Sequence, residues 1–220
     1  MKTHGTTLSV DEATRLDVML QFEREAIAHG FSRIAGVDEA GRGPLAGPLV
    51  AAAVVLANPV CGVNDSKQLT ESQRTHIFES LQSGGHAIGV GVVVPSVIDQ
   101  HGLQSANYGA MLQAVAGLVP PPDFLLVDGF VIRGCSLAQK RIVKGDCLSI
   151  SIAAASIVAK VTRDRMMEAL DKQYPQYGFA KHKGYGTAEH LQALREYGPC
   201  PAHRKSFAPI ADSPETGILF

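Results

Sequence analysis

The sequence predicts an α/β fold in which a mixed β-sheet is flanked by helices. Short apolar runs rich in β-branched residues occur first as neighbours, and later runs alternate with longer segments of helical periodicity. Hydrophobic residues make up 45% of the chain and charged residues 19%, a composition typical of globular proteins. Neither an internal repeat nor a long linker divides the chain. We therefore expect residues 1–220 to form a single domain.

The expected strands are short apolar runs bounded by glycine, proline or polar residues. They lie at residues 34–38, 49–56, 88–94, 124–127 and 141–143. The first two flank a turn rich in glycine and proline, so the sequence predicts that they form a hairpin.

The expected helices have apolar residues at helical spacing. They lie at residues 10–29, 70–82, 103–118 and 151–173. Thr70 and Gln73 have the spacing of a capping box, which marks the start of the second helix. Small residues in the last helix would let it lie close to the sheet. From there to about residue 210 we expect loops and one short helix capped by Thr187.

Composition excludes several classes of protein. Glycine and proline interrupt the most apolar segment, residues 44–60, so it indicates buried strands and not a membrane span. The first twenty residues are polar and acidic, unlike a secretory signal. The cysteines are scattered without a C-x-x-C pair, which argues against a zinc site or a disulfide framework. We therefore expect a cytoplasmic protein without a membrane partner.

The formal net charge of −1 does not by itself indicate a nucleic-acid partner. Basic residues are nevertheless concentrated between residues 140 and 165 and between residues 181 and 205. Two such stretches suit a surface that follows phosphates. A solvated protein face explains the same pattern equally well.

Four acidic residues stand at or after the ends of expected strands. Asp38 and Glu39 end one strand, Asp128 ends another, and Asp146 follows a third. If these ends meet at one edge of the sheet, their mutual repulsion requires a cation, and oxygen ligands favour Mg²⁺ or Mn²⁺ over Zn²⁺. Two such ions are a common device for displacing a phosphodiester. Each acid could instead be a turn or cap residue, a reading that four acids in one kind of place disfavour.

The turn Gly41-Arg42-Gly43 begins two residues after Glu39. Two glycines around an arginine allow the backbone to approach a ligand closely and to offer free N–H donors. An isolated Gly-x-Gly is usually only a hairpin turn. Its position beside the acidic pair favours a role in binding.

These motifs, taken together, resemble bacterial ribonuclease HII, the type 2 ribonuclease H family. The resemblance runs in order over about residues 34–209, some four-fifths of the chain. The segments that carry it are Asp38-Glu39-Ala40-Gly41-Arg42-Gly43-Pro44, Asn64-Asp65-Ser66-Lys67, Val127-Asp128-Gly129, Lys144-Gly145-Asp146, Ala154-Ala155-Ser156-Ile157-Val158-Ala159-Lys160 and His182-Lys183-Gly184-Tyr185.

The resemblance implies a ribonuclease H-like fold with a small C-terminal helical extension. The catalytic core would span about residues 33–172 and the substrate-binding extension about 173–210, with residues 211–220 as a flexible tail. The family cleaves the RNA strand of RNA–DNA hybrids and nicks duplex DNA on the 5′ side of an embedded ribonucleotide, leaving 3′-hydroxyl and 5′-phosphate ends. A two-metal site with Mg²⁺ or Mn²⁺ is implied.

The resemblance also assigns roles to residues of this chain. The catalytic and metal-binding acids fall on the four already selected by position, which are Asp38, Glu39, Asp128 and Asp146. The backbone of Gly41, Arg42 and Gly43 would contact the ribose 2′-hydroxyl. Tyr185 would stack on the sugar beyond the ribonucleotide, although a core tyrosine is the alternative. Candidates for phosphate or supporting contacts are Lys67, Ser156 and Lys160, although helix lysines are usually solvated.

Several alternatives remain open from the sequence. Another nuclease of the same fold class, such as a resolvase, would use similar acids but would need no ribose sensor. A non-catalytic nucleic-acid-binding protein would not need the acids at all. We expect a monomer. Some family members bind the replication sliding clamp through a C-terminal segment, and residues 218–220 loosely resemble such a motif, although packing on their own domain or fraying are the simpler readings.

Overall fold

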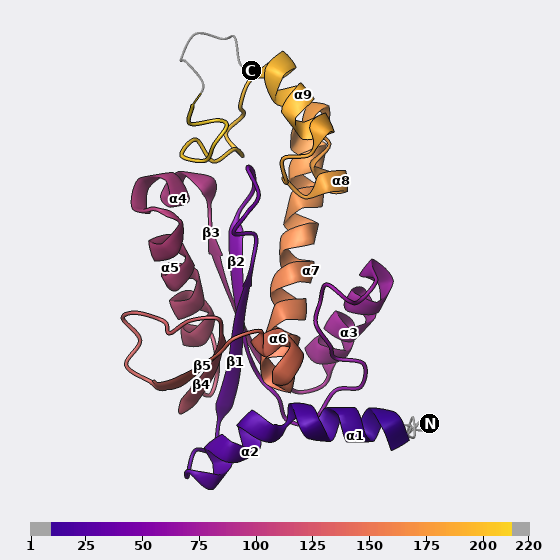
Figure 1. Ribbon diagram of the computed structural model, residues 1–220, viewed down its shortest axis with the longest axis vertical. Coiled ribbons are helices and arrows are strands. Elements are labelled where there is room, and N and C mark those ends of the chain that lie inside the picture. Colours follow the sequence, from indigo (N-terminus) through magenta and orange to yellow (C-terminus); the bar gives the residue numbers. More distant parts are fainter. Residues whose placement is uncertain (1–9, 213–220) are drawn as a thin grey trace.

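The computed structural model describes residues 10–212. A five-stranded mixed sheet lies between two layers of helices (Figure 1). Its strand order is β3-β2-β1-β4-β5, with β1 antiparallel to β2, β2 antiparallel to β3, and β1, β4 and β5 mutually parallel. The strands are β1 (Ile34–Ala40), β2 (Leu49–Val55), β3 (Ala87–Val93), β4 (Phe124–Asp128) and β5 (Ala138–Ile142). The predicted mixed sheet flanked by helices is confirmed.

The helices form two layers and two end groups (Figure 1). One face of the sheet is covered by α7 (Ile150–Gln173) and α3 (Glu71–Ser83). The other face is covered by α4 (Pro95–His101) and α5 (Leu103–Ala116). At the lower end of the view in Figure 1 lie α1 (Val10–Met19) and α2 (Gln21–Ala28), with α6 (Gly145–Leu148) at the start of α7. At the far end of α7 lie a 3-10 helix (Pro175–Tyr177), α8 (Phe179–His182) and α9 (Ala188–Tyr197).

The long helix α7 is the element that positions much of the site. Its cap is Ser149, whose hydroxyl accepts a hydrogen bond from the N–H of Ile152 at 3.3 Å. Every residue from 150 to 159 is buried against β1 and β2. Each large aliphatic side chain buried there contributes roughly 1.5–3 kcal/mol. Farther along, Ser156, Lys160 and Arg163 recur at helical spacing, and they face the cleft described below.

Some expected elements differ in the structure. The helix expected at residues 10–29 is interrupted at Leu20, because Leu16 and Met19 pack into one apolar cluster while Ala26 packs into another. Strand β5 begins three residues earlier than expected, since its largely exposed polar residues hide the strand from a hydrophobic pattern. The short helices α4, α6 and α8 were not predicted. Only α4 carries a clear signal, Pro95 in its first turn.

No helix among residues 10–212 is both long enough and apolar enough to cross a lipid bilayer. The longest, α7, carries arginine, lysine and aspartate along its second half.

Candidate active site

Two of the four predicted acids come together because of strand direction. Strands β1 and β4 are parallel neighbours, and Val37 pairs with Val127 in their register. The next residues are Asp38, which is still within β1, and Asp128, which ends β4, so they lie at the same end of the two strands. Asp38 is buried, with 5% of its surface exposed. Glu39 follows it on β1 and lines the same cleft.

Asp146 reaches this edge by a different route from the one expected. It lies in the first turn of the short helix α6, four residues after β5, and not directly after the strand. Lys144 adopts a left-handed conformation (φ 56°), which turns the chain into α6. The N–H of Gly145 then donates to Oδ1 of Asp128 at 2.7 Å, which fixes α6 beside β4. Lys67 joins Asp146 in an ion pair, with Nζ to Oδ2 at 3.0 Å.

The carboxylates repel one another in a poorly hydrated place. Burial, reinforced by the charges of Glu39 and Asp128, raises the pKa of Asp38 well above its usual range. Burial likewise raises the pKa of Glu39, although Arg42 opposes the change. The pKa of Asp128 is also raised by burial and by Asp146, while the hydrogen bond from Gly145 opposes it. Acids in a cleft whose pKa values are raised by burial and by one another mark a candidate functional site.

The donor set fits a hard divalent cation. Oε2 of Glu39 is buried and has no hydrogen-bond partner among the described residues, so it is free to act as a ligand. All four acids offer carboxylate oxygens, the ligand type that Mg²⁺ and Mn²⁺ prefer. A bound cation would also relieve the repulsion that raises the pKa values of Asp38 and Asp128.

Replacing Asp38 by asparagine should therefore stabilise the metal-free protein at neutral pH. Because the pKa of Asp38 is higher in the folded than in the unfolded state, stability falls as pH rises from the unfolded to the folded value, and the full cost persists above it. We expect a gain of about 1 kcal/mol, or roughly 2–4 °C in Tm for a chain of this size, by calorimetry in chelator. Adding Mg²⁺ should stabilise the original protein more than the variant.

The matched control is Asp123→Asn. Asp123 is half-buried. Burial tends to raise its pKa, but hydrogen bonds from the hydroxyl and N–H of Ser32 and from the N–H of Arg33 outweigh burial and lower it. That substitution should lower the Tm or leave it unchanged. An Asp38→Asn variant that is less stable than the original protein in chelator would contradict the assignment of repulsion at this site.

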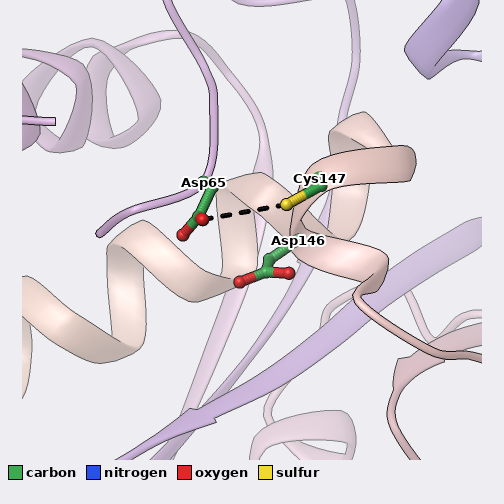
Figure 2. A group of neighbouring side chains, drawn as sticks. All are labelled: Asp65, Asp146 and Cys147. Carbon is green, nitrogen blue, oxygen red and sulfur yellow. Dashed lines mark hydrogen bonds between the residues drawn. The ribbon is translucent and has the colours of Figure 1, made fainter. Parts of the chain in front are cut away.

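A further acid, to which the sequence analysis assigned no role, lies beside Asp146. Figure 2 shows Asp65, from the loop before α3, facing Asp146 and Cys147 of α6. One ligand atom from each of the three lies within 4.8 Å of the others. The thiol is a poor ligand for a hard cation, and burial together with Asp146 and Asp65 raises the pKa of Cys147. What this group adds to the site is therefore one more possible oxygen ligand, the carboxylate of Asp65 beside Asp146.

The Gly-Arg-Gly turn has a geometry that demands glycine at its first position. Gly41 has φ +96°, and a Cβ there would lie 2.1 Å from Nε of Arg163. At Gly43 a Cβ would lie 3.6 Å from Cε1 of Tyr185, so the tyrosine ring is close to the turn. The N–H of Leu45 donates to the carbonyl of Gly184 at 2.8 Å, which joins the turn to the loop that carries Tyr185.

These elements enclose one cleft of about 270 Å³. It is lined by every predicted site residue except Asp146, which is ion-paired with the lining residue Lys67. The lining residues are Asp38, Glu39, Ala40, Gly41, Arg42, Gly43, Ser66, Lys67, Asp128, Ser156, Lys160, Arg163 and Tyr185. Among the lining residues, Lys160 is paired with Asp164 at 2.8 Å and Ser156 lies 3.0 Å from the Ser66 hydroxyl. Tyr185 is 49% exposed at the rim and is not a core residue.

The basic stretches do not form one continuous basic face. Lys140, Lys181 and Lys183 are ion-paired with glutamates, and two of the arginines, Arg163 and Arg204, are fully buried. The sequence shows the density of basic residues but not the acids that other elements bring to them. Surface pairs of this kind are worth only about 0–1 kcal/mol, so phosphates can replace the glutamates.

Sequence reasoning missed three residues that line the site or contact the residues that do. Arg163 lines the cleft and Arg204 binds the carbonyls of the turn, yet both looked like members of basic stretches. Asn107 of α5 is fully buried, and its side chain lies close enough to Glu39 to lower the pKa of that acid. No local pattern marks these residues, since their partners are distant in the chain.

Comparison with known proteins identifies the family. The family model described as Ribonuclease HII matches residues 35–210. A ribonuclease HII of Geobacillus kaustophilus is 52% identical over 200 residues, which cover 90% of this chain and 76% of that protein. The chain belongs to the ribonuclease HII family. It is therefore an enzyme of the ribonuclease class.

Solved structures of ribonuclease HII relatives agree with the fold. The ribonuclease H2 of Pyrococcus horikoshii OT3 is 30% identical, with a TM-score of 0.69 over 82% of this chain and 96% of that one. A ribonuclease HII from Archaeoglobus fulgidus, solved in a complex with PCNA, is 26% identical with a TM-score of 0.69, covering 80% and 95%. The sequence-based resemblance to ribonuclease HII and the expected ribonuclease H-like fold are confirmed.

Proposed function

We propose that this chain is a divalent-metal-dependent endoribonuclease. It cleaves the RNA strand of RNA–DNA hybrids and nicks duplex DNA on the 5′ side of an embedded ribonucleotide, leaving 3′-hydroxyl and 5′-phosphate ends. The observation that carries the proposal is the shared cleft, which is lined by three of the four acids, by the Gly-Arg-Gly turn and by Tyr185. Family membership supports the same activity.

The acids would hold Mg²⁺ or Mn²⁺ through Asp38, Glu39, Asp128 and Asp146. When bound, two such ions supply a nucleophile at neutral pH and stabilise charge on the leaving oxygen. The protein contributes the alignment. Asp38 accepts from the N–H of Glu39 at 2.7 Å, and Asp128 accepts from Gly145, so each carboxylate is fixed by the backbone.

The Gly-Arg-Gly turn would distinguish a ribonucleotide from a deoxyribonucleotide. A ribose 2′-hydroxyl is the group that separates RNA from DNA at one nucleotide, and backbone donors and acceptors can bind it without contacting the base. Gly41 and Gly43 expose that backbone to the cleft, and Tyr185 offers a half-exposed ring beside Gly43. In this proposal the ring packs on the neighbouring sugar. Lys67, Ser156 and Lys160 line the cleft where phosphates would pass.

The division of the chain is part of the proposal. Residues 33–172 would form the catalytic core and residues 173–210, with α8 and α9, the extension that holds Tyr185 over the cleft. The expected monomeric state and cytoplasmic location remain predictions.

Cleavage of a DNA duplex that contains one ribonucleotide, against the same duplex in DNA only, tests the function. We expect metal-dependent nicking at the ribonucleotide and no cleavage of the control. Tyr185→Ala should lower cleavage of the single-ribonucleotide duplex by about 10-fold or more, since base- or sugar-stacking aromatics contribute roughly 1–3 kcal/mol each. Equal cleavage of both duplexes would favour a resolvase-like nuclease of the same fold class. Hybrid binding without any cleavage would favour a non-catalytic binding protein.

The predicted interaction of residues 218–220 with the replication sliding clamp lies outside the described residues. The relative from Archaeoglobus fulgidus, solved with PCNA, is the observation that favours it. Recovery of the clamp on the immobilised full chain, compared with a chain lacking residues 213–220, tests the idea. Equal recovery would contradict it.

A further inference from the structure

Two buried arginines bind the backbone of the Gly-Arg-Gly turn and of the residues that follow it. Arg204 follows α9, near the end of the described chain, and Arg163 belongs to α7. Their exposed fractions are 0% and 1%. Neither forms an ion pair with a carboxylate in residues 10–212; their guanidinium groups bind backbone carbonyls instead.

Every one of those carbonyls belongs to residues 41–48. Arg204 donates to Gly41 through Nη2 at 2.6 Å, to Arg42 through Nη1 at 3.0 Å, and to Gly47 through Nε at 3.1 Å and Nη2 at 2.9 Å. Arg163 donates to Pro48 and Ala46 at 2.9 and 3.1 Å. The two guanidinium groups thereby satisfy carbonyls along this whole segment.

The segment that carries Arg204 is itself held in place by hydrogen bonds to α4 and to the turn. The carboxylate of Asp99 in α4 accepts from the N–H groups of Lys205 and Ser206 at 3.0 and 2.9 Å, and from the Ser206 hydroxyl at 2.6 Å. The N–H of Arg204 donates to Leu45, and Gly47 donates to Ala202, each at 2.8 Å. The turn is thus held between the catalytic core and the C-terminal extension.

Burying two cations without carboxylate partners is costly, and the fold gains no ion pair in return. A lysine could not replace the arrangement, because only the planar guanidinium donates in several fixed directions at once. This cost of burial is explained if the two arginines serve to fix the position of the turn.

We propose that Arg204, assisted by Arg163, is a positioning residue that fixes residues 41–48 in the geometry that recognises ribose. The proposal deepens the proposed function and rests on it for its consequence in catalysis. Its structural half, the rigidity of the turn, does not depend on any substrate.

Arg204→Lys in the full chain, followed by hydrogen–deuterium exchange, tests the structural half. Exchange at the amides of residues 40–48 should rise by about 10-fold or more, while the peptides of β2 and β4 stay unchanged. Arg33→Lys is the matched control, since Arg33 also binds backbone carbonyls, those of Pro120 and Pro121, at the opposite end of β1. Unchanged exchange at residues 40–48 would overturn the proposal.

Kinetics test the functional half. For Arg204→Lys, kcat/KM on the single-ribonucleotide duplex should fall on the order of 10- to 100-fold, while the Ki of an all-DNA competitor stays within about twofold. A merely structural role would weaken both together, and that result would overturn the positioning role, as would unchanged kcat/KM. If the unmodified enzyme does not prefer the ribonucleotide duplex, the proposed function fails. The exchange result alone then decides whether Arg204 fixes residues 41–48. Should Arg204→Lys not fold, Arg163→Lys carries the same expectations.

Discussion

Asp128→Asn should abolish metal-dependent cleavage while leaving binding of an RNA–DNA hybrid largely intact. The amide keeps the oxygen that accepts from Gly145, so α6 should stay in place. It loses the negative charge that a divalent cation requires among Asp38, Glu39 and Asp146. We expect kcat to fall by at least about 10³-fold, equivalent to about 4 kcal/mol of transition-state stabilisation. Single-turnover kinetics and hybrid binding measured on the same preparation check both halves.

The control lies at the other end of the same strand. Asp123 immediately precedes β4 and Asp128 ends it, so Asp123→Asn makes the same chemical change at the opposite edge of the sheet. Its cleavage rate should stay within about twofold of the original. Residual activity in Asp128→Asn within tenfold of the original protein would show that this carboxylate is not part of the metal site.

Gly41→Ala should damage both stability and activity. The new Cβ would require a left-handed conformation at φ +96° and would meet the Arg163 side chain at 2.1 Å and the carbonyl of Pro48 at 2.8 Å. Left-handed strain and overpacking together should cost about 2–4 kcal/mol. The displaced turn should lower kcat/KM on a single-ribonucleotide duplex on the order of 100-fold. Denaturant unfolding and steady-state cleavage measure the two effects.

Gly85→Ala is the matched control, which has the backbone strain of a positive φ without close contacts around the new Cβ. Gly85 has φ +72°, yet a Cβ there would meet nothing within 4 Å, and it lies in the turn after α3, far along the chain from the cleft. It should cost about 1 kcal/mol and leave cleavage unchanged. If Gly41→Ala proved no more destabilising than Gly85→Ala, the close packing of Arg163 on the turn would be wrong.

The elements that could be predicted from sequence are those whose cause is local. The capping box of Thr70 and Gln73 is present in the structure, and Thr187 caps α9 as expected. Asp38 and Asp128 could be placed together because each ends an apolar run, and parallel neighbours end at the same edge. Chemistry at strand ends is visible in a sequence for this reason.

What could not be predicted depends on contacts between distant segments. Asp65 joins Asp146 across 81 positions of sequence, and Arg204 binds Gly41 across 163. The concentration of basic residues suggested that these arginines contact phosphates. In the structure Arg163 and Arg204 are buried and donate to backbone carbonyls instead. The predicted start of strand β5 was wrong because β5 lies at the edge of the sheet, where its side chains are largely exposed and show no apolar pattern.

Mapping the ends of the nick in a single-ribonucleotide duplex tests the central claim most directly. If the carboxylates hold the catalytic cations and the turn binds the 2′-hydroxyl, that hydroxyl is recognised and does not attack. The products should then carry a 3′-hydroxyl and a 5′-phosphate, with the cut on the 5′ side of the ribonucleotide and none in chelator. A 2′,3′-cyclic phosphate, or cleavage that survives removal of divalent metal, would contradict the account.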